Sequence, residues 1–260
     1  SVGLVVTSDR PIVAERVLYF GNGSGSGKFG ATVSGGVAAP GTILGVTTAG
    51  GAAQTFLTLL NPAASGTPVS VSATIADAGA QPVGTPVALK VAAGTRQTFA
   101  ASQGSGASGG PTSILLNASG PIAAEVVQYF GGSPNVGNHP GVAYPAQGAA
   151  AHTVYIPDVS TSLADGTPIT RTVYLYNPGT APITVDAFYV GTGGVSPEVT
   201  YSVPAGGITT VNVNVDAGLP AGPIGAVFTV TTKNGALVAS SLGLTADGKS
   251  ATESAGVPGS

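Results

Sequence analysis

The fold is decided by residues 113–131, which read Ser113-Ile114-Leu115-Leu116-Asn117, then Ala118-Ser119-Gly120, then Pro121-Ile122-Ala123-Ala124-Glu125-Val126-Val127-Gln128-Tyr129-Phe130-Gly131. The first and last parts are rich in Val, Ile and Leu, and each is about as long as a β-strand. The short middle part holds the small residues and the glycine that tight connections favour. The stretch therefore predicts a hairpin whose turn lies at residues 118–120.

The same pattern is found at two other places in the chain. Residues 3–21 repeat it around Ser8-Asp9-Arg10, and residues 226–244 repeat it in a degenerate form around Lys233-Asn234-Gly235. Asn-Gly favours a tight turn because both residues tolerate a positive φ. Both faces of the second arm are mostly apolar, which predicts a strand that is covered on both sides. Of the two faces, we expect the one with Glu15 and Glu125 to meet the core.

Other phrases repeat at a similar distance. Gly36-Val37 recurs as Gly141-Val142 and Gly256-Val257, at spacings of 141 − 36 = 105 and 256 − 141 = 115 residues, and the pairs Asn61-Pro62 and Asn177-Pro178 lie 177 − 61 = 116 residues apart. Repeats of this size are whole domains. Each contains several short strands with frequent turn signals and no long helical pattern. Residues 210–215 alternate apolar and polar side chains, which predicts a strand, and residues 183–189 alternate less regularly. The chain is therefore predicted to be all-β, as tandem immunoglobulin-like β-sandwich domains, with a small barrel as the alternative.

The repeats predict three parts of the chain. Residues 46–147 and 148–260 would each be a β-sandwich repeat, and residues 1–45 would be an N-terminal hairpin, either the end of an incomplete repeat or a strand for another subunit. An isolated hairpin is marginally stable and its edges attract other strands. It would pack on the next domain, complete a sheet in a neighbouring subunit, or belong to a longer chain. The predicted assembly residues of this hairpin are Leu4, Val5, Val6, Ile12, Val13, Val17 and Tyr19.

The composition limits the possible partners. Only 7% of the 260 residues are charged, against roughly 25% in an average soluble domain. A surface with so few charges resists association weakly, which suits a protein that packs against copies of itself. The net charge of −3 argues against nucleic acid as a partner. No apolar run approaches the ~20 residues that span a bilayer, and any signal peptide would already have been removed.

Several phrases carry a resemblance to a known class of repeats. They are residues 11–19, Asn177-Pro178-Gly179, Val203-Pro204-Ala205-Gly206 and residues 137–142. In these the chain resembles the tandem β-sandwich repeats of large secreted proteins of filamentous green non-sulfur bacteria and their relatives. The resemblance implies a secreted, cell-surface repeat protein without a catalytic site. The chain departs from that pattern where Ser240 replaces the acid of the third copy, and it has no tryptophan.

Some short motifs imitate catalytic or cofactor-binding sites. Residues 25–30 and 104–109 fit G-x-G-x-x-G, but no predicted helix follows to bind a phosphate. Ser108 fits a nucleophile motif inside a Gly/Ser-rich loop, where the required strand-to-helix turn is missing. Two histidines, His139 and His152, without any cysteine rarely build a zinc site. We therefore predict no enzyme activity, no cofactor and no metal.

Glu15 and Glu125 occupy equivalent positions, 125 − 15 = 110 residues apart. A buried carboxylate must be paired or neutralised. Because they lie in different repeats and have no neighbouring acids at calcium-loop spacing, we expect structural acids, each bonded to backbone, a tyrosine hydroxyl or an arginine.

Two functions remain from different classes. The first is a structural subunit of an extracellular filament, sheath or surface layer, whose partners are copies of itself. The second is a monomeric adhesin or carbohydrate-binding module of a larger secreted protein, with surface glycans as partners. Exposed tyrosines would favour the second, and the candidates are Tyr144, Tyr155, Tyr174 and Tyr176.

Overall fold

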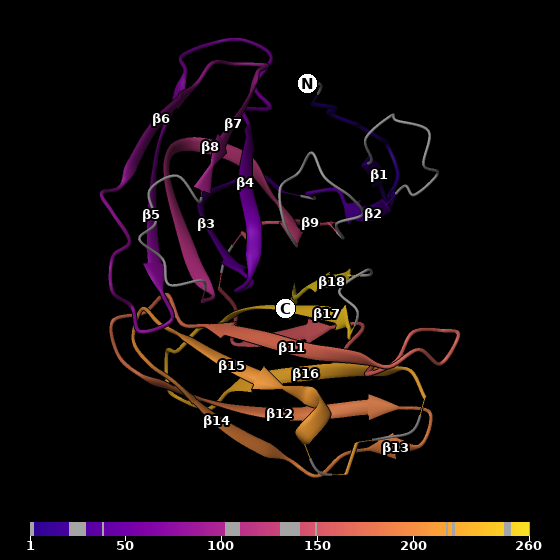
Figure 1. The fold of residues 1–260 in the computed structure, drawn as a ribbon. Coiled ribbons are helices and arrows are strands. Elements are labelled where there is room, and N and C mark those ends of the chain that lie inside the picture. Colours follow the sequence, from indigo (N-terminus) through magenta and orange to yellow (C-terminus); the bar gives the residue numbers. More distant parts are fainter. Residues whose placement is uncertain are drawn as a thin grey trace.

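The computed structural model describes residues 3–20, 30–37, 39–101, 110–130, 141–148, 150–216, 218–219, 222–246 and 251–259. In this part the protein is all-β: antiparallel sheets fill it, with a short 3₁₀ turn at Val213–Val215 (Figure 1). The predicted all-β class is confirmed. The described part contains no helix that is long and apolar enough to cross a membrane.

The first unit, residues 41–148, is built around one long strand. Its strands are β3 (Gly41–Thr48), β4 (Ala52–Leu60), β5 (Val69–Asp77), β6 (Val87–Val91), β7 (Arg96–Ala100), β8 (Thr112–Phe130) and β9 (Gly141–Pro145). The first half of β8 pairs with β3 and β5, and the second half pairs with β4 and β9. Because β3 begins at Gly41, the predicted boundary between residues 45 and 46 falls inside a strand.

The predicted hairpin at residues 113–131 is wrong. Its two arms do not pair with each other; they form one 19-residue strand that curves from one half of the sheet to the other (Figure 1). Strands that change sheets bend at such corners, and glycine is common where a neighbour approaches closely. A Cβ on Gly120, at the corner, would lie 3.2 Å from Val69 Cγ2. The small residues that predicted a turn instead permit this bend.

The second unit, residues 150–259, consists of two separate sheets. Its strands are β10 (Thr153–Ile156), β11 (Ile169–Tyr176), β12 (Ile183–Gly191), β13 (Gly194–Val195), β14 (Val199–Val203), β15 (Ile208–Asn212), β16 (Ile224–Val230), β17 (Val238–Thr245), β18 (Ala251–Ala255) and β19 (Val257–Pro258). One sheet has the order β13-β12-β16-β10-β19, with β14 also on β12; the other has the order β15-β11-β17-β18.

The third predicted hairpin joins these two sheets. The turn itself is confirmed, because Asn234 has φ 61° and Gly235 N–H donates to Thr232 O at 3.0 Å. Its arms, however, are β16 and β17, which belong to different sheets. Turn residues specify a local reversal of the chain but not the strand with which each arm will pair.

The N-terminal unit, residues 3–37, holds β1 (Glu15–Phe20) and β2 (Gly30–Gly35), which pair with each other. The predicted hairpin at residues 3–21 is also wrong, because residues 3–14 are in no strand. The pair β1–β2 has the register of β8–β9: Glu15 lies opposite Gly35, and Glu125 lies opposite Pro145, so both partners are shifted by 125 − 15 = 145 − 35 = 110 residues. The pair β17–β18 continues the series with Ser240 opposite Ala255.

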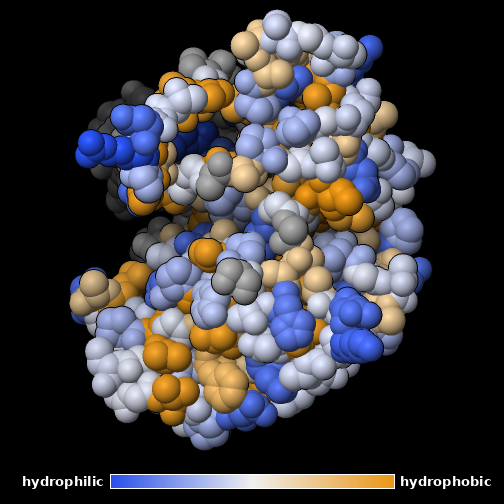
Figure 2. Space-filling view, turned by 180° about the vertical axis from the view of Figure 1, so that it is seen from behind, coloured by the Kyte–Doolittle hydropathy of each residue, from blue (hydrophilic) through white to orange (hydrophobic). Residues whose placement is uncertain are grey.

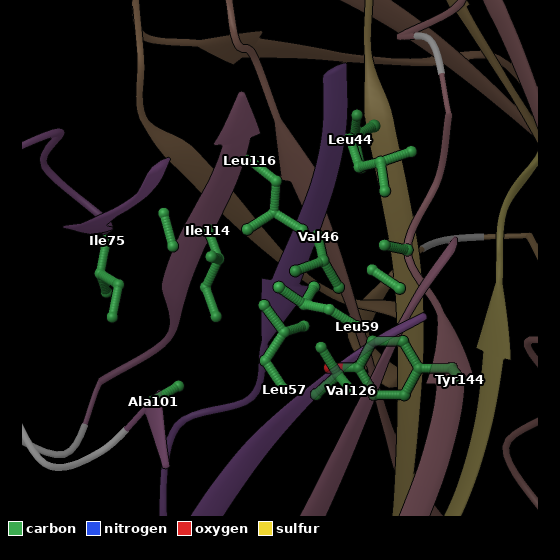
Figure 3. Packing of buried hydrophobic residues seen from close by; sticks show 14 of the residues in the cluster. Leu44, Val46, Leu57, Leu59, Ile75, Ala101, Ile114, Leu116, Val126 and Tyr144 are labelled. Atoms are coloured by element: carbon green, nitrogen blue, oxygen red, sulfur yellow. The ribbon is translucent and has the colours of Figure 1, made fainter. Parts of the chain in front are cut away.

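Each of the two larger units has a hydrophobic cluster. In the first unit, side chains of both halves of the sheet pack together, and Figure 3 labels Leu44, Val46, Leu57, Leu59, Ile75, Ala101, Ile114, Leu116, Val126 and Tyr144. In the second unit, Val173, Leu175 and Phe228 are among the residues between the two sheets. Tyr174 and Tyr176 point to the opposite side of β11 and join the cluster of the first unit. The β11 sheet is therefore covered on both faces.

The predicted core face of the hairpin arm is wrong. In β8 the buried face carries Ile122, Ala124, Val126, Gln128 and Phe130, while Glu125 is half-buried on the other face. A polar residue is accepted in this face because its amide is satisfied: Ala49 N–H donates to Gln128 Oε1 at 3.0 Å, and Gln128 Nε2 donates to Ala49 O at 3.2 Å.

Candidate assembly surface

The predicted assembly residues lie on the surface of the N-terminal unit. Val13 is 90% exposed and Leu4 79% exposed, and the other exposed members are Val5, Val6, Ile12 and Val17. Tyr19 lies in β1, but its side chain is outside what the structure describes. Scattered single apolar residues are common on protein surfaces, whereas here six exposed aliphatic residues fall within residues 4–17.

These side chains are exposed because the N-terminal unit has few neighbours. Within the described residues, β1 pairs only with β2, whereas the equivalent second half of β8 lies between β4 and β9. The unit is attached through β2, since Ala143 N–H of β9 donates to Thr32 Oγ1 at 3.3 Å. The outer edge of β1 thus presents backbone groups to which another strand can bond.

The two predicted structural acids differ. Glu125 forms an ion pair with Arg16, whose Nη2 lies 2.7 Å from Oε1 and 2.6 Å from Oε2. Glu15 is exposed, so the expectation that it lies on a buried face is wrong. An acid in contact with solvent needs no partner. Arg16 therefore links the N-terminal unit to the first unit.

A second set of contacts joins the first and second units. This inner joint has more hydrogen bonds than the Arg16–Glu125 contact, which is the outer joint, and it is less exposed to solvent. The hydroxyls of Thr47 and Ser240 lie 2.6 Å apart, and Ile208 N–H donates to Ala78 O at 3.0 Å. The side-chain amide of Gln147 bonds to both backbone groups of Ala239. These contacts hold the outer face of the β11 sheet against β3.

This joint also encloses an acid, Glu253, and a buried arginine, Arg171, lies behind it in the second unit; the sequence analysis singled out neither residue. Burial raises the pKa of Glu253 well above its ordinary value, although Ser240 and Arg171 oppose the shift. Some of the residue's surface is exposed, but its carboxyl group points inward. Arg171 is 1% exposed and lies on the opposite face of β11, inside the second unit, where it bonds Asp158 at 3.1 Å and Ser160 O at 3.0 Å. The isolated charge of Arg171 inside an apolar strand is the signal that sequence reading had available.

Most of the residues that the sequence suggested for catalysis or cofactor binding lie outside the described part of the chain. Ser108, His139 and the two Gly-rich motifs at residues 25–30 and 104–109 lie outside the described residues, apart from Gly30. His152 is exposed. No group of His, Asp or Glu side chains in the described part of the chain is placed to hold a metal ion.

Comparison with known proteins adds no identification: no family model matches the chain, and no curated protein or solved structure matches it either.

Proposed function

We propose that this chain is a structural subunit of an extracellular filament, sheath or surface layer, which assembles with copies of itself through strand edges and apolar surface. The observation that carries the proposal is the N-terminal unit, where six predicted aliphatic side chains are exposed and β1 has, within the described residues, β2 as its one partner strand. Exposed aliphatic surface at an unpaired strand is the surface that strand addition uses. The 7% content of charged residues leaves little repulsion between copies.

We also propose that the two larger units are tandem immunoglobulin-like sandwiches. The repeated register supports this: Leu57 pairs with Val126 in the first unit, and Val173 pairs with Ser241 in the second. Repeats with equivalent strands suit a protein that is built by addition of similar modules. The extracellular location rests on the resemblance to repeats of secreted, cell-surface proteins.

No observation favours the alternative of a carbohydrate-binding module. A stacking platform needs exposed aromatic rings. Tyr144, Tyr174 and Tyr176 are buried, and Tyr155 is the one exposed member of the four candidates.

The test compares the chain with a variant that carries Val6→Glu, Ile12→Glu and Val13→Glu. All three side chains are exposed, so the fold should tolerate the substitutions, while three buried charges at a contact would oppose assembly. We expect large assemblies of the unaltered chain in light scattering and negative-stain microscopy, and monomers of the variant. A matched control, Ile43→Glu with Val215→Glu, changes two exposed aliphatic residues outside the N-terminal unit and should assemble normally. A monomeric unaltered chain would contradict the proposal.

A further inference from the structure

A row of apolar side chains crosses the outer face of the second unit. Phe188 of β12 lies opposite Val227 of β16, Val227 lies opposite Tyr155 of β10, and Tyr155 lies opposite Val257 of β19. The neighbouring row consists of Asp186, Thr229 and Thr153, which pair across the same strands. The row is thus an apolar stripe beside a polar one, on the face that does not meet the core.

The first unit has the same row, in which Thr74 lies opposite Leu115, Leu115 opposite Gly45, and Gly45 opposite Gln147. Two of these positions are covered by the second unit. A Cβ on Gly45 would lie 3.0 Å from Val238 Cγ2, and Gln147 bonds to Ala239. In the first unit, this end of the row is therefore the place where the next unit docks.

In the second unit the same two positions are open. Tyr155, in the place of Gly45, is 47% exposed, and Val257, in the place of Gln147, is 52% exposed. We propose that the row Phe188–Val227–Tyr155–Val257 is the docking surface for the N-terminal unit of a second copy of this chain. The inference rests on the proposed function and names the surface that receives the N-terminal unit.

The positions of the exposed apolar residues favour the N-terminal unit of a second copy as the partner of this row. Apart from Ile43 and Val215, every exposed large hydrophobic residue in the described part of the chain belongs to one of two places. One is the N-terminal unit; the other is this face, where Val190 and Val195 pair beside Phe188. Figure 2 shows hydrophobic side chains at the surface of both the upper and the lower halves of the molecule.

The two surfaces differ, so their contact is heterologous. A contact between two different surfaces leaves one free surface of each kind on every dimer, and such a contact generates rings or open filaments. Both surfaces also present an open edge in the described residues, since β1 pairs only with β2 and β19 is the last strand of its sheet. This geometry fits head-to-tail growth.

The experiment uses two variants of the full chain, each with one surface blocked. In the tail variant the docking row is blocked by Tyr155→Glu and Val257→Glu. In the head variant the N-terminal unit is blocked by Val6→Glu, Ile12→Glu and Val13→Glu. We expect each variant alone to be monomeric in analytical ultracentrifugation. An equal mixture should form dimers and nothing larger, because the intact N-terminal unit of the tail variant can bind the intact docking row of the head variant, and no other intact surface remains. Circular dichroism melts verify that both variants are folded, and Tyr155→Phe should assemble like the unaltered chain.

The outcomes separate the two proposals. If the tail variant assembles as the unaltered chain does, or if the mixture stays monomeric, this docking surface is wrong while the proposed function can stand. If the unaltered chain is itself monomeric, both proposals fail. The Ile43→Glu/Val215→Glu control should assemble in every case in which the unaltered chain does.

Discussion

Residues 11–20 and 121–130 have nearly the same sequence and the same pairing register, yet they lie in opposite surroundings. In β8 the segment lies between two strands and over a hydrophobic cluster, and Val126 is fully buried. In β1 the segment has one partner strand in the described residues, and Arg16 occupies the place of Val126 with a 44% exposed side chain. The pairing register is therefore encoded locally, whereas burial depends on the strands that surround the segment.

The outer joint, between the N-terminal unit and the first unit, and the inner joint, between the first and second units, also differ in their exposure to solvent. At the N-terminal joint, the ion pair Arg16–Glu125 is partly open to solvent. At the joint between the two larger units, Glu253 occupies the place that Ala143 holds in the first unit, and its carboxyl is enclosed. The joint between the two larger units is thus a packed interface, while the N-terminal joint includes an ion pair that is partly open to solvent.

The largest expected effect comes from making β8 resemble β1. Val126→Arg places a charge in a core without a partner, and we expect it to lower the free energy of unfolding by more than about 3 kcal/mol. Val17→Arg, at an exposed position of β1, should change it by less than about 0.5 kcal/mol. Urea denaturation of both variants measures the difference. Similar losses from the two substitutions would show that the two segments are equally buried.

An intermediate effect is expected at the inner joint. Because the folded-state pKa of Glu253 is raised, the folded chain keeps a proton that the unfolded chain releases above its ordinary pKa. The contribution of Glu253 to the free energy of unfolding is therefore fully present below the ordinary pKa of a glutamate, and it is lost as the pH rises through the raised pKa of the folded state. Glu253→Gln should remove that dependence and stabilise the chain by about 1–2 kcal/mol at high pH.

The measurement is a series of urea denaturation curves between about pH 5 and about pH 8. At each pH the free energy of unfolding of the variant is compared with that of the unaltered chain. Glu198→Gln, at an exposed acid of the same unit, is the matched control and should leave the pH dependence unchanged. A difference that is constant with pH would mean that Glu253 is ionised in the folded chain.

The smallest effect is expected at the outer joint. Arg16→Gln removes the ion pair with Glu125, and partly exposed pairs contribute about 0.2–1 kcal/mol. The loss should shrink as salt is added, because salt screens exposed charges. Denaturation curves at low and high ionic strength test this. A loss that salt does not alter would indicate a joint held by packing and not by charge.

The sequence predicted the all-β class and the turn at Asn234-Gly235. The predicted hairpins were wrong because apolar alternation and turn residues indicate strands and reversals but do not specify which strands pair with each other. The predicted core face of β8 was wrong because both faces are apolar, and the only polar side chain on the buried face, Gln128, is satisfied by the backbone of Ala49. Arg16, an arginine where the second copy has valine, was the local sign that the first copy has a different environment.

By itself, the sequence determined that the chain is all-β, where it can bend or reverse, and how few charges it carries, because these follow from side-chain shape, glycine and composition. Only the tertiary structure decided that residues 112–130 form one strand, that Glu253 is enclosed at a joint, and that Tyr155 and Val257 are open where Gly45 and Gln147 are covered. These depend on contacts between residues distant in the chain, such as Thr47 and Ser240 at 2.6 Å, and no local pattern encodes a distant neighbour.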